Sequence, residues 1–386
     1  MPGFSSTDQI VSAMTSGQSL RKDWAKNFVG TASATAVANE WHFLGKGGGN
    51  PPADALFDTG TALTFQPVSD TTANAASILH GGDVSPKYKH ILSASAVTAA
   101  ATVVPCTLAL IDVIGYYRVT AVTTATEQAT TNNLSAFSTF TADASTDIIT
   151  HSNINLMNYS RIQVSSTTTL PAGLSAATNY YVIKVTDTTC KLATSYANAV
   201  AGTAINITDA GTGTHTINTL YPRYTNGAGV NAFFFNPQAT ALGAATPNLR
   251  LNYTNTEGTT SRATPTVYPV GKTAATNSHI LHTGATAAGK YNYSVPLQAG
   301  DAGILSIEGI RNETSYVSGM YSVILYKELL RIPLSTLGLA AERNLLNEMP
   351  SLPRVYDGAA LYWTLGSGVA TPINSAFSGH LDFVWN

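Results

Sequence analysis

The sequence predicts a mainly β fold, and three observations lead to this prediction. From residue 30 onward, short segments rich in Val, Ile, Thr, Tyr and Phe are separated by clusters of Gly, Pro, Asn and Asp. The segment from Leu249 to Tyr253 alternates apolar and polar residues, as a half-buried strand does. Helical spacing is confined to residues 6–28 and 336–348. We expect a β-sandwich or jelly-roll-like host domain with an inserted small β-sandwich, a short N-terminal helical arm and one short C-terminal helix.

The N-terminal segment, residues 1–29, carries the first helical signals. Ser6 and Gln9 have the spacing of a capping box. Leu20, Trp24 and Phe28 follow at intervals of four, which predicts a second short helix. The segment either packs on its own domain or forms an arm that docks on a neighbouring subunit. In the second case, Trp24 and Phe28 are candidate partner contacts.

The strand pattern is clearest in a few segments of the host domain. Thr107 to Val119 is the strongest apolar stretch of the first half and predicts a central strand. Leu249, Leu251 and Tyr253 alternate with polar residues, which predicts a half-buried strand. Further strands are expected over 320–330, 361–363 and 381–385.

Composition changes between about residues 122 and 219. This stretch is dense in Thr, Ser, Asn and Ala, and its strand signals repeat about every ten residues, as in a small all-β sandwich. The segments on either side carry the Trp residues and most of the charge. We therefore expect one host domain, residues 30–121 and 220–386, interrupted by an inserted Ig-like sandwich over 122–219.

Charge and hydropathy exclude several classes of protein. Only 11% of the 386 residues are charged, and the formal net charge is −2, so the chain has no general attraction for nucleic acid. The longest apolar run is interrupted by Asp112, Gly115 and Arg118, and is too short to cross a bilayer. The first residues lack a basic region followed by an apolar core, so we expect no secretory signal. Cys106 and Cys190 are expected to be buried and unpaired.

Motifs for catalysis or cofactor binding are not found in the sequence. It contains no Gly-x-Ser-x-Gly elbow, Walker loop or dinucleotide fingerprint. His279 and His282 are three residues apart, but no Glu accompanies them as in a metalloprotease helix. His80, Asp83 and His90 form either a cation loop or, in our preferred interpretation, a hydrogen-bonded polar loop. We assign no catalytic, cofactor or metal residues and expect a protein that is not an enzyme.

Three consecutive aromatic residues suggest a different kind of site. Phe233, Phe234 and Phe235 place rings on both faces of an expected strand. One face belongs to the core, and the other is covered either by the fold or by a partner. The candidate partner contacts are therefore Trp24, Phe28, Phe233, Phe234 and Phe235.

The most specific signal is a series of short segments within the inserted region. In order, it reads Leu170–Ser175, Asn179–Ile183, Cys190–Ser195, Asn198–Val200 and Asp209–His215. This series resembles a small β-sandwich module that recurs in virion proteins of tailed bacteriophages. It covers about a quarter of the chain.

The host halves resemble structural proteins of tailed phages more weakly. In those relatives, a Gly-Tyr-Tyr stretch like Gly115–Tyr117 runs almost directly into a stretch like Tyr224–Gly229, which supports the expected insertion. The segments that carry this likeness are Asp23–Lys26, His80–Ser85, Asp112–Tyr117, Tyr224–Val230 and Leu352–Ala359.

The resemblance implies a non-enzymatic structural protein of the virion. We expect a head decoration (cement) or minor capsid protein on the outer surface of the phage head, made in the cytoplasm of the bacterial host. Its expected partners are the major capsid protein and further copies of itself, for example in a trimer, without nucleic acid, membrane or cofactor. Bridging contacts would stabilise the shell by mass action, and the inserted domain would contact host surfaces or glycans weakly.

Two alternatives stay open from the sequence. The chain could be a tail, baseplate or fibre component, although heptad and shaft repeats are not found. It could also be a receptor-binding or polysaccharide-degrading tail protein, although the sequence shows no short fixed period of a stacked β-helix.

Overall fold

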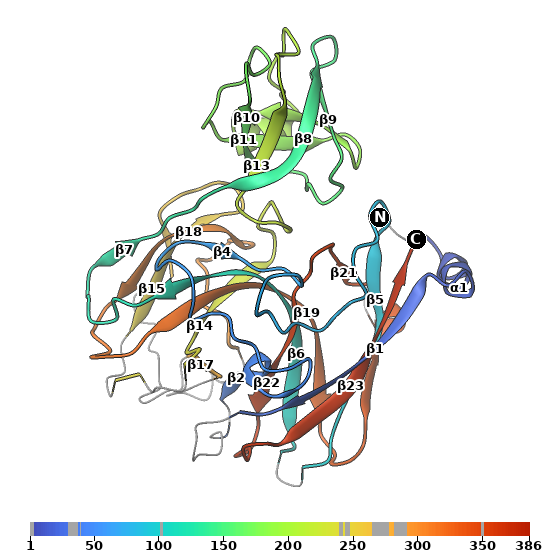
Figure 1. The fold of residues 1–386 in the computed structure, drawn as a ribbon, viewed down its shortest axis with the longest axis vertical. Coiled ribbons are helices and arrows are strands. Elements are labelled where there is room, and N and C mark those ends of the chain that lie inside the picture. The colour runs from blue at the N-terminus through green and yellow to red at the C-terminus, as the bar shows by residue number, and fades with distance from the viewer. Residues whose placement is uncertain are drawn as a thin grey trace.

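The computed structural model describes residues 4–29, 38, 40–100, 103–238, 242–243, 248–264, 278–281, 292–348 and 351–386. Its fold is mainly β, which confirms the predicted class. A small barrel lies above a larger body of several sheets, and the two ends of the described chain lie close together on one side (Figure 1). Its helices are short: α1 (Thr7–Thr15), η1 (Leu44–Lys46), α2 (Tyr196–Ala201) and α3 (Leu345–Glu348).

One sheet of the body has six strands and contains both the first and the last strand of the chain. Its strands, in spatial order, are β20 (Ala341–Asn344), β5 (Lys89–Thr98), β23 (Ala376–Trp385), β1 (Ser19–Asn27) and β3 (Gly49–Asn50), and β21 (Arg354–Val355) pairs with β5 beside them.

The second sheet of the body has seven strands, and an extra pairing between its members β19 and β6 closes most of it into a ring. In spatial order they are β19 (Tyr321–Leu334), β14 (Val230–Phe235), β17 (His279–Leu281), β2 (Trp41–Phe43), β22 (Leu361–Ser367), β6 (Cys106–Val119) and β4 (Gln66–Pro67).

A four-stranded sheet flanks the ring on the side of the barrel (Figure 1). Its strands, in spatial order, are β16 (Arg262–Ala263), β15 (Leu249–Asn255), β18 (Ile304–Asn312) and β7 (Glu127–Ala129).

Six strands of the inserted region close into a barrel of their own. In spatial order they are β10 (Arg161–Ser166), β11 (Tyr180–Lys184), β12 (Thr189–Ala193), β9 (Ile148–His151), β8 (Ser135–Asp143) and β13 (His215–Thr219).

The barrel strands begin later than the composition change suggested. The expected insert runs from 122 to 219, but Glu127–Ala129 pairs with β18 of the body. Thr131 also exchanges backbone hydrogen bonds with residues 63 and 65 of the body. By its hydrogen bonds, the segment before Ser135 therefore belongs to the body, whereas the last barrel strand ends at Thr219.

The long apolar runs form the strands that the sequence predicts. The stretch from Thr107 to Val119 lies in β6, which pairs with β19, β22 and β4 of the seven-stranded sheet. Leu108 and Leu110 pack in the core toward the six-stranded sheet, whereas Ile111 and Val113 pack in the core inside the ring. Both faces of β6 are covered, which explains why its sequence is apolar almost throughout. Strands are also confirmed over residues 249–255, 321–334, 361–367 and 376–385.

The N-terminal prediction is correct for one helix and wrong for the other. The side chain of Ser6 accepts a hydrogen bond from the Gln9 amide at the start of α1. Residues 19–27, however, form β1, antiparallel to β23, instead of a second helix. The interval of four between Leu20, Trp24 and Phe28 is also twice the strand period, so it places the three side chains on one face of a strand as readily as on one face of a helix.

The C-terminal helix is shorter than predicted. Of the expected range 336–348, residues 341–344 form β20 at the edge of the six-stranded sheet, and only Leu345–Glu348 are helical. Leu345 is buried, but Leu339 is 64% exposed. The leucines therefore do not share one buried helical face, and pairing with β5 prevails over helical spacing.

Candidate functional site

The five predicted partner contacts are all interior residues of this chain, so that prediction is corrected. Trp24 is 2% exposed, and Phe28 and the three phenylalanines of β14 are fully buried. Trp24 lies against Trp363, with ring centroids 4.9 Å apart. Phe233 and Phe235 pack inside the ring, and Phe234 packs in the core on its other side. The fold itself covers both faces of β14, and none of these rings is offered to a partner.

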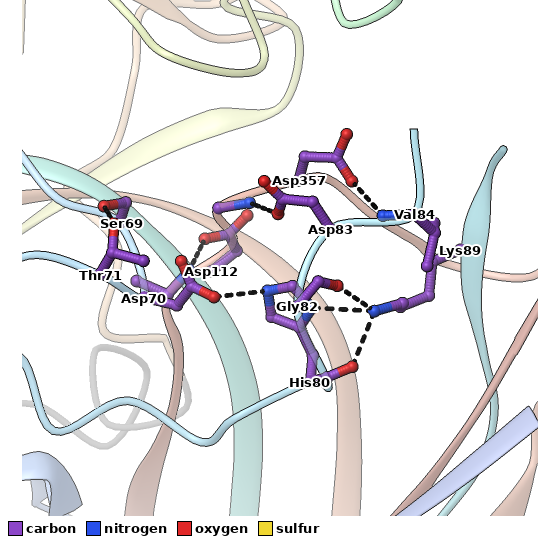
Figure 2. A network of polar contacts seen from close by, with 12 residues as sticks. Ser69, Asp70, Thr71, His80, Gly82, Asp83, Val84, Lys89, Asp112 and Asp357 are labelled. Atoms are coloured by element: carbon purple, nitrogen blue, oxygen red, sulfur yellow. Dashed lines mark hydrogen bonds and ion pairs between the residues drawn. The ribbon is translucent and has the colours of Figure 1, made fainter. Parts of the chain in front are cut away.

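The polar loop that contains His80 forms a buried network with residues from distant parts of the chain (Figure 2). Lys89 on β5 donates to the backbone oxygens of His80 at 2.8 Å and Gly82 at 2.5 Å. Its Nζ is also 3.2 Å from His80 Nδ1. The opposite ring nitrogen, Nε2, lies 3.2 Å from Asp70 Oδ2. A lysine donor at Nδ1 leaves the proton on Nε2, where it faces the Asp70 carboxylate.

Two aspartates tie this loop to the segment before β22. The Val84 amide donates to Asp357 Oδ1 at 3.1 Å, and the Gly358 amide donates to Asp83 Oδ1 at 2.9 Å. Figure 2 shows both carboxylates beside the His80 loop. This reciprocal pair fixes two segments that are more than 250 residues apart in sequence, so it contributes to the fold.

A buried ion pair continues the polar cluster into the body. Asp112, on β6, accepts from Arg223 Nε at 2.7 Å, and both side chains are fully buried. Arg223 also donates to the backbone oxygen of Val68 at 2.9 Å, and the Ala360 amide donates to Asp112 at 3.0 Å. Arg223 follows the last barrel strand, so this pair anchors the returning chain in the body.

Burial dominates the protonation of this cluster. Burial and then the Lys89 ammonium lower the pKa of His80 to about 4. Burial also lowers the pKa of Lys89 and raises the pKa of Asp70 and of Asp357. His80 is therefore neutral near pH 7, and Lys89 already supplies a cation at this place. These features suit a structural network more than a cation-binding loop.

His90, which the sequence places near His80, lies apart from this network. Its Nδ1 is 3.3 Å from the backbone oxygen of Leu352, and its ring meets Phe4 edge to face. His80 and Asp83 are thus brought into one cluster, and His90 is not.

A second cluster joins His279 to two residues that the sequence reasoning missed. His279 on β17 lies directly opposite His42 on β2, and Glu40 precedes β2. Glu40 Oε2 lies 3.1 Å from His279 Nε2 and 3.8 Å from His42 Nε2. His282, the sequence neighbour of His279, lies outside the described residues. The Glu-x-His spacing ahead of a short apolar run was an available signal, since residues two apart share one face of a strand.

The structure also has two surface cavities of similar size, and the first borders the Glu40 cluster, since the Ser367 hydroxyl in its lining donates to the backbone oxygen of Glu40. One, of about 490 Å³, is lined by residues that include Trp41, Arg331 and Ser367. The other, of about 510 Å³, lies where Met157, from the inserted region, meets Tyr224 and Arg354 of the body. Cys106 and Cys190 are both buried and unpaired, as expected, and burial raises the pKa of each thiol to about 12.

Comparisons with known proteins give no family. No family model matches the sequence, and no curated protein matches it. Among solved structures, the infectious bursal disease virus VP2 subviral particle is 10% identical with a TM-score of 0.12, covering 79% of this chain and 83% of that one. A structure of the infectious bursal disease virus Gt strain is 10% identical with a TM-score of 0.11, covering 83% of each chain. At these TM-scores, neither similarity supports a conclusion about the fold or function of this chain. Within the described part of the chain, no helix is long and apolar enough to span a membrane.

Proposed function

We propose that this chain is a non-enzymatic structural protein of a tailed-phage virion, and specifically a head decoration or minor capsid protein. The observation that carries the proposal is the coincidence of the phage-like series with a single structural unit. The segments from Leu170 to His215 all lie between the end of β10 and the first residue of β13, in the strands of the closed barrel and in their connections. Asn179–Ile183 leads into and forms most of β11, Cys190–Ser195 covers β12, and Asn198–Val200 lies in α2.

The construction of the body also favours a structural role. Its buried polar side chains are bonded to one another and to the backbone in clusters that join distant segments, as in Asp112–Arg223 and His80–Asp70. In the proposed function, such a body holds neighbouring capsid subunits together, and binding to the assembled shell stabilises that shell by mass action. Attachment through several copies would multiply weak contacts.

The contact surface must differ from the buried aromatic residues, and α1 supplies a candidate. Its inner face packs Ile10 and Ala13 on Val384 of β23. Its outer face carries Val11, which is 54% exposed, and Met14, which is 45% exposed. We propose that this outer face contacts the capsid.

A labelling experiment tests the location. Immunogold labelling of intact virions, with an antibody raised against the whole chain, is expected to place gold over the entire head. Gold confined to the tail or to one vertex would reject the decoration role and favour a tail component. No gold on virions that contain the chain by mass spectrometry would place it inside the particle.

The contact surface is tested by substitution. Val11→Asp with Met14→Asp is expected to lower the chain's occupancy on expanded capsids by at least about 10-fold, since two charges would have to be desolvated at the interface. Leu79→Asp, at another exposed apolar position, is the matched control. Equal occupancy of both variants in capsid sedimentation would exclude α1 as the contact.

A further inference from the structure

We propose that Glu40, His42 and His279 form a binding site for one divalent first-row transition-metal ion, with Zn²⁺ as the best fit. The proposal concerns these residues alone and does not depend on the function proposed above. Two imidazoles and one carboxylate are ligands that such ions prefer, whereas Ca²⁺ and Mg²⁺ require sites made mostly of oxygen.

Strand register brings the three side chains together. β2 and β17 are antiparallel neighbours, and His42 and His279 are directly paired residues. Directly opposed residues have neighbouring side chains on the same face of a sheet. Their ring centroids are 4.4 Å apart. Glu40 is two residues before His42, so extended backbone places its carboxylate on the same side.

The distances match a site that needs little adjustment. The three ligand atoms all lie within 4.8 Å of one another. Ligand atoms around one tetrahedral Zn²⁺, at the usual bond lengths, are about 3.3 Å apart. Glu40 Oε2 is already 3.1 Å from His279 Nε2 and 3.8 Å from His42 Nε2. Two of the three separations between ligand atoms are therefore already close to those that one ion requires.

Ser278 directs a nitrogen of His42 toward the site. The Ser278 hydroxyl donates to the backbone oxygen of Val29, so its oxygen is left to accept from another donor. His42 Nδ1 lies 3.5 Å from that oxygen. A proton on Nδ1 leaves the lone pair on Nε2, the atom that faces Glu40. Neighbours of this kind commonly fix the tautomer of a metal-binding histidine.

Burial gives the ion a structural role. The side chain of His42 is fully buried, that of His279 is 5% exposed, and that of Glu40 is 15% exposed. Three protein ligands leave one position for water on the open side, at Glu40. The ion would pin β2 to β17, two short strands that lie side by side in the ring (Figure 1).

The His80 cluster shows why the proposal falls on this site and not on that one. His80 also faces a carboxylate, at 3.2 Å, but the Lys89 ammonium lies 3.2 Å from its other nitrogen. A second cation there would be repelled. That cluster also offers one imidazole, whereas the Glu40 cluster offers two.

Metal titration of the purified, tag-free chain of 386 residues tests the proposal. After treatment with EDTA and removal of the chelator, the chain is expected to bind one Zn²⁺ and to unfold at a higher temperature with Zn²⁺ than without it. Co²⁺ is expected to give the visible absorption of a nitrogen- and oxygen-ligated ion, which Zn²⁺ then displaces. X-ray absorption of the Zn²⁺ form is expected to show scattering from two imidazoles.

Variants assign the site to these residues. Glu40→Gln and His279→Gln are each expected to weaken Zn²⁺ binding by at least about 10-fold. His151→Gln replaces a buried histidine of the barrel and is expected to bind Zn²⁺ as the unmodified chain does. Unchanged affinity in both site variants, sulfur ligands in the absorption spectrum, or a lack of stoichiometric binding by the unmodified chain would each overturn the proposal. The last two results require no variant, so the test holds even where a substitution prevents folding.

Discussion

At the scale of single residues, Asp112 and Arg223 place opposite charges in a fully buried position. Replacing Asp112 by Asn leaves the Arg223 guanidinium without a balancing charge, which is expected to cost about 3–5 kcal/mol of the free energy of unfolding. Replacing the pair together, as Asp112→Leu with Arg223→Met, is expected to recover part of that loss because no isolated charge remains. Urea denaturation measures the free energy of unfolding of the unmodified chain, of Asp112→Asn and of the double variant.

The control for this prediction is an ion pair near the surface. Lys184 lies 2.9 Å from Asp187, and their side chains are 24% and 44% exposed. Lys184→Met is expected to change stability by less than about 1 kcal/mol, since solvent screens such pairs. If Asp112→Asn costs no more than Lys184→Met, the buried pair does not have the role assigned to it.

The lowered pKa of His80 predicts that the folded chain loses stability in mild acid. In the folded chain its pKa is about 4, whereas the ordinary value is 6.5. Between pH 6.5 and about pH 4, His80 is therefore mostly protonated in the unfolded chain and mostly neutral in the folded chain. Stability contributed by neutral His80 is present above pH 6.5 and falls as the pH drops toward 4, by at most about 3 kcal/mol.

Comparison with His80→Gln isolates this effect. Burial also lowers the pKa of His90 and His151, but those residues are present in both proteins and cancel in the difference. The free energy of unfolding is expected to fall less in His80→Gln than in the unmodified chain between about pH 7 and pH 5. Equal slopes would show that His80 takes up its proton at an ordinary pKa.

At the scale of elements, the pairing of β5 with β23 depends on a glycine. A Cβ added to Gly379 would lie 1.9 Å from the backbone oxygen of Ser95, so the two strands would have to separate. Gly379→Ala is expected to destabilise the chain by about 1–3 kcal/mol, as other overpacked sites do. Gly48 has no atom within 4 Å of an added Cβ, and Gly48→Ala is the matched control, expected to be neutral or slightly stabilising. Thermal unfolding of both variants distinguishes them, and a Gly379 variant as stable as the Gly48 variant would contradict the pairing.

Elements with one clear period were predictable, and elements with an ambiguous period were not. The alternation of β15 indicates a strand, the β-branched and aromatic residues of the apolar run in β6 favour a strand over a helix, and both predictions are confirmed. The spacing of Leu20, Trp24 and Phe28 suits a helix and a strand equally, and pairing with β23 decides between them. Because β1 and β23 are more than 300 residues apart in sequence, the local pattern around Leu20, Trp24 and Phe28 could not predict their pairing.

The sites depend even more on long-range register. His279 was visible in the sequence, but its neighbours His42 and Glu40 come from a strand more than 230 residues earlier. Asp112 and Arg223 are 111 residues apart, with the whole barrel between them. Local sequence could suggest that His80 and Asp83 belong to a polar loop. It could not supply Asp70, Lys89 and Asp357, because the fold alone brings those residues to the loop.

At the scale of the whole molecule, the barrel and the body have separate cores. Within the described part of the chain, the barrel strands β8 to β13 pair only with one another. The barrel core shares no residue with the cores of the body, although Met157 of the inserted region packs against one of those cores. The contacts between the two parts include polar ones, such as Arg161 with Ser306 and Arg354 with Asn155. Two parts with separate cores can open separately, since each loses its own buried contacts when it does so.

Because the two cores are separate, we can predict which strands lose stability when a core residue of the barrel or of the body is replaced. Ile162 in β10 and Ile111 in β6 are both fully buried, and replacing either by Ala is expected to cost about 2–5 kcal/mol in its own part. In hydrogen exchange followed by mass spectrometry, Ile162→Ala is expected to increase exchange in β8 to β13 and to leave β6 and β19 protected. Ile111→Ala is expected to increase exchange in β6, β19 and β22 and to leave the barrel protected, because the barrel keeps all of its own ladder hydrogen bonds. If Ile162→Ala raises exchange equally in β6 and β19, the barrel and body unfold as one unit, and the contacts between them couple the two cores.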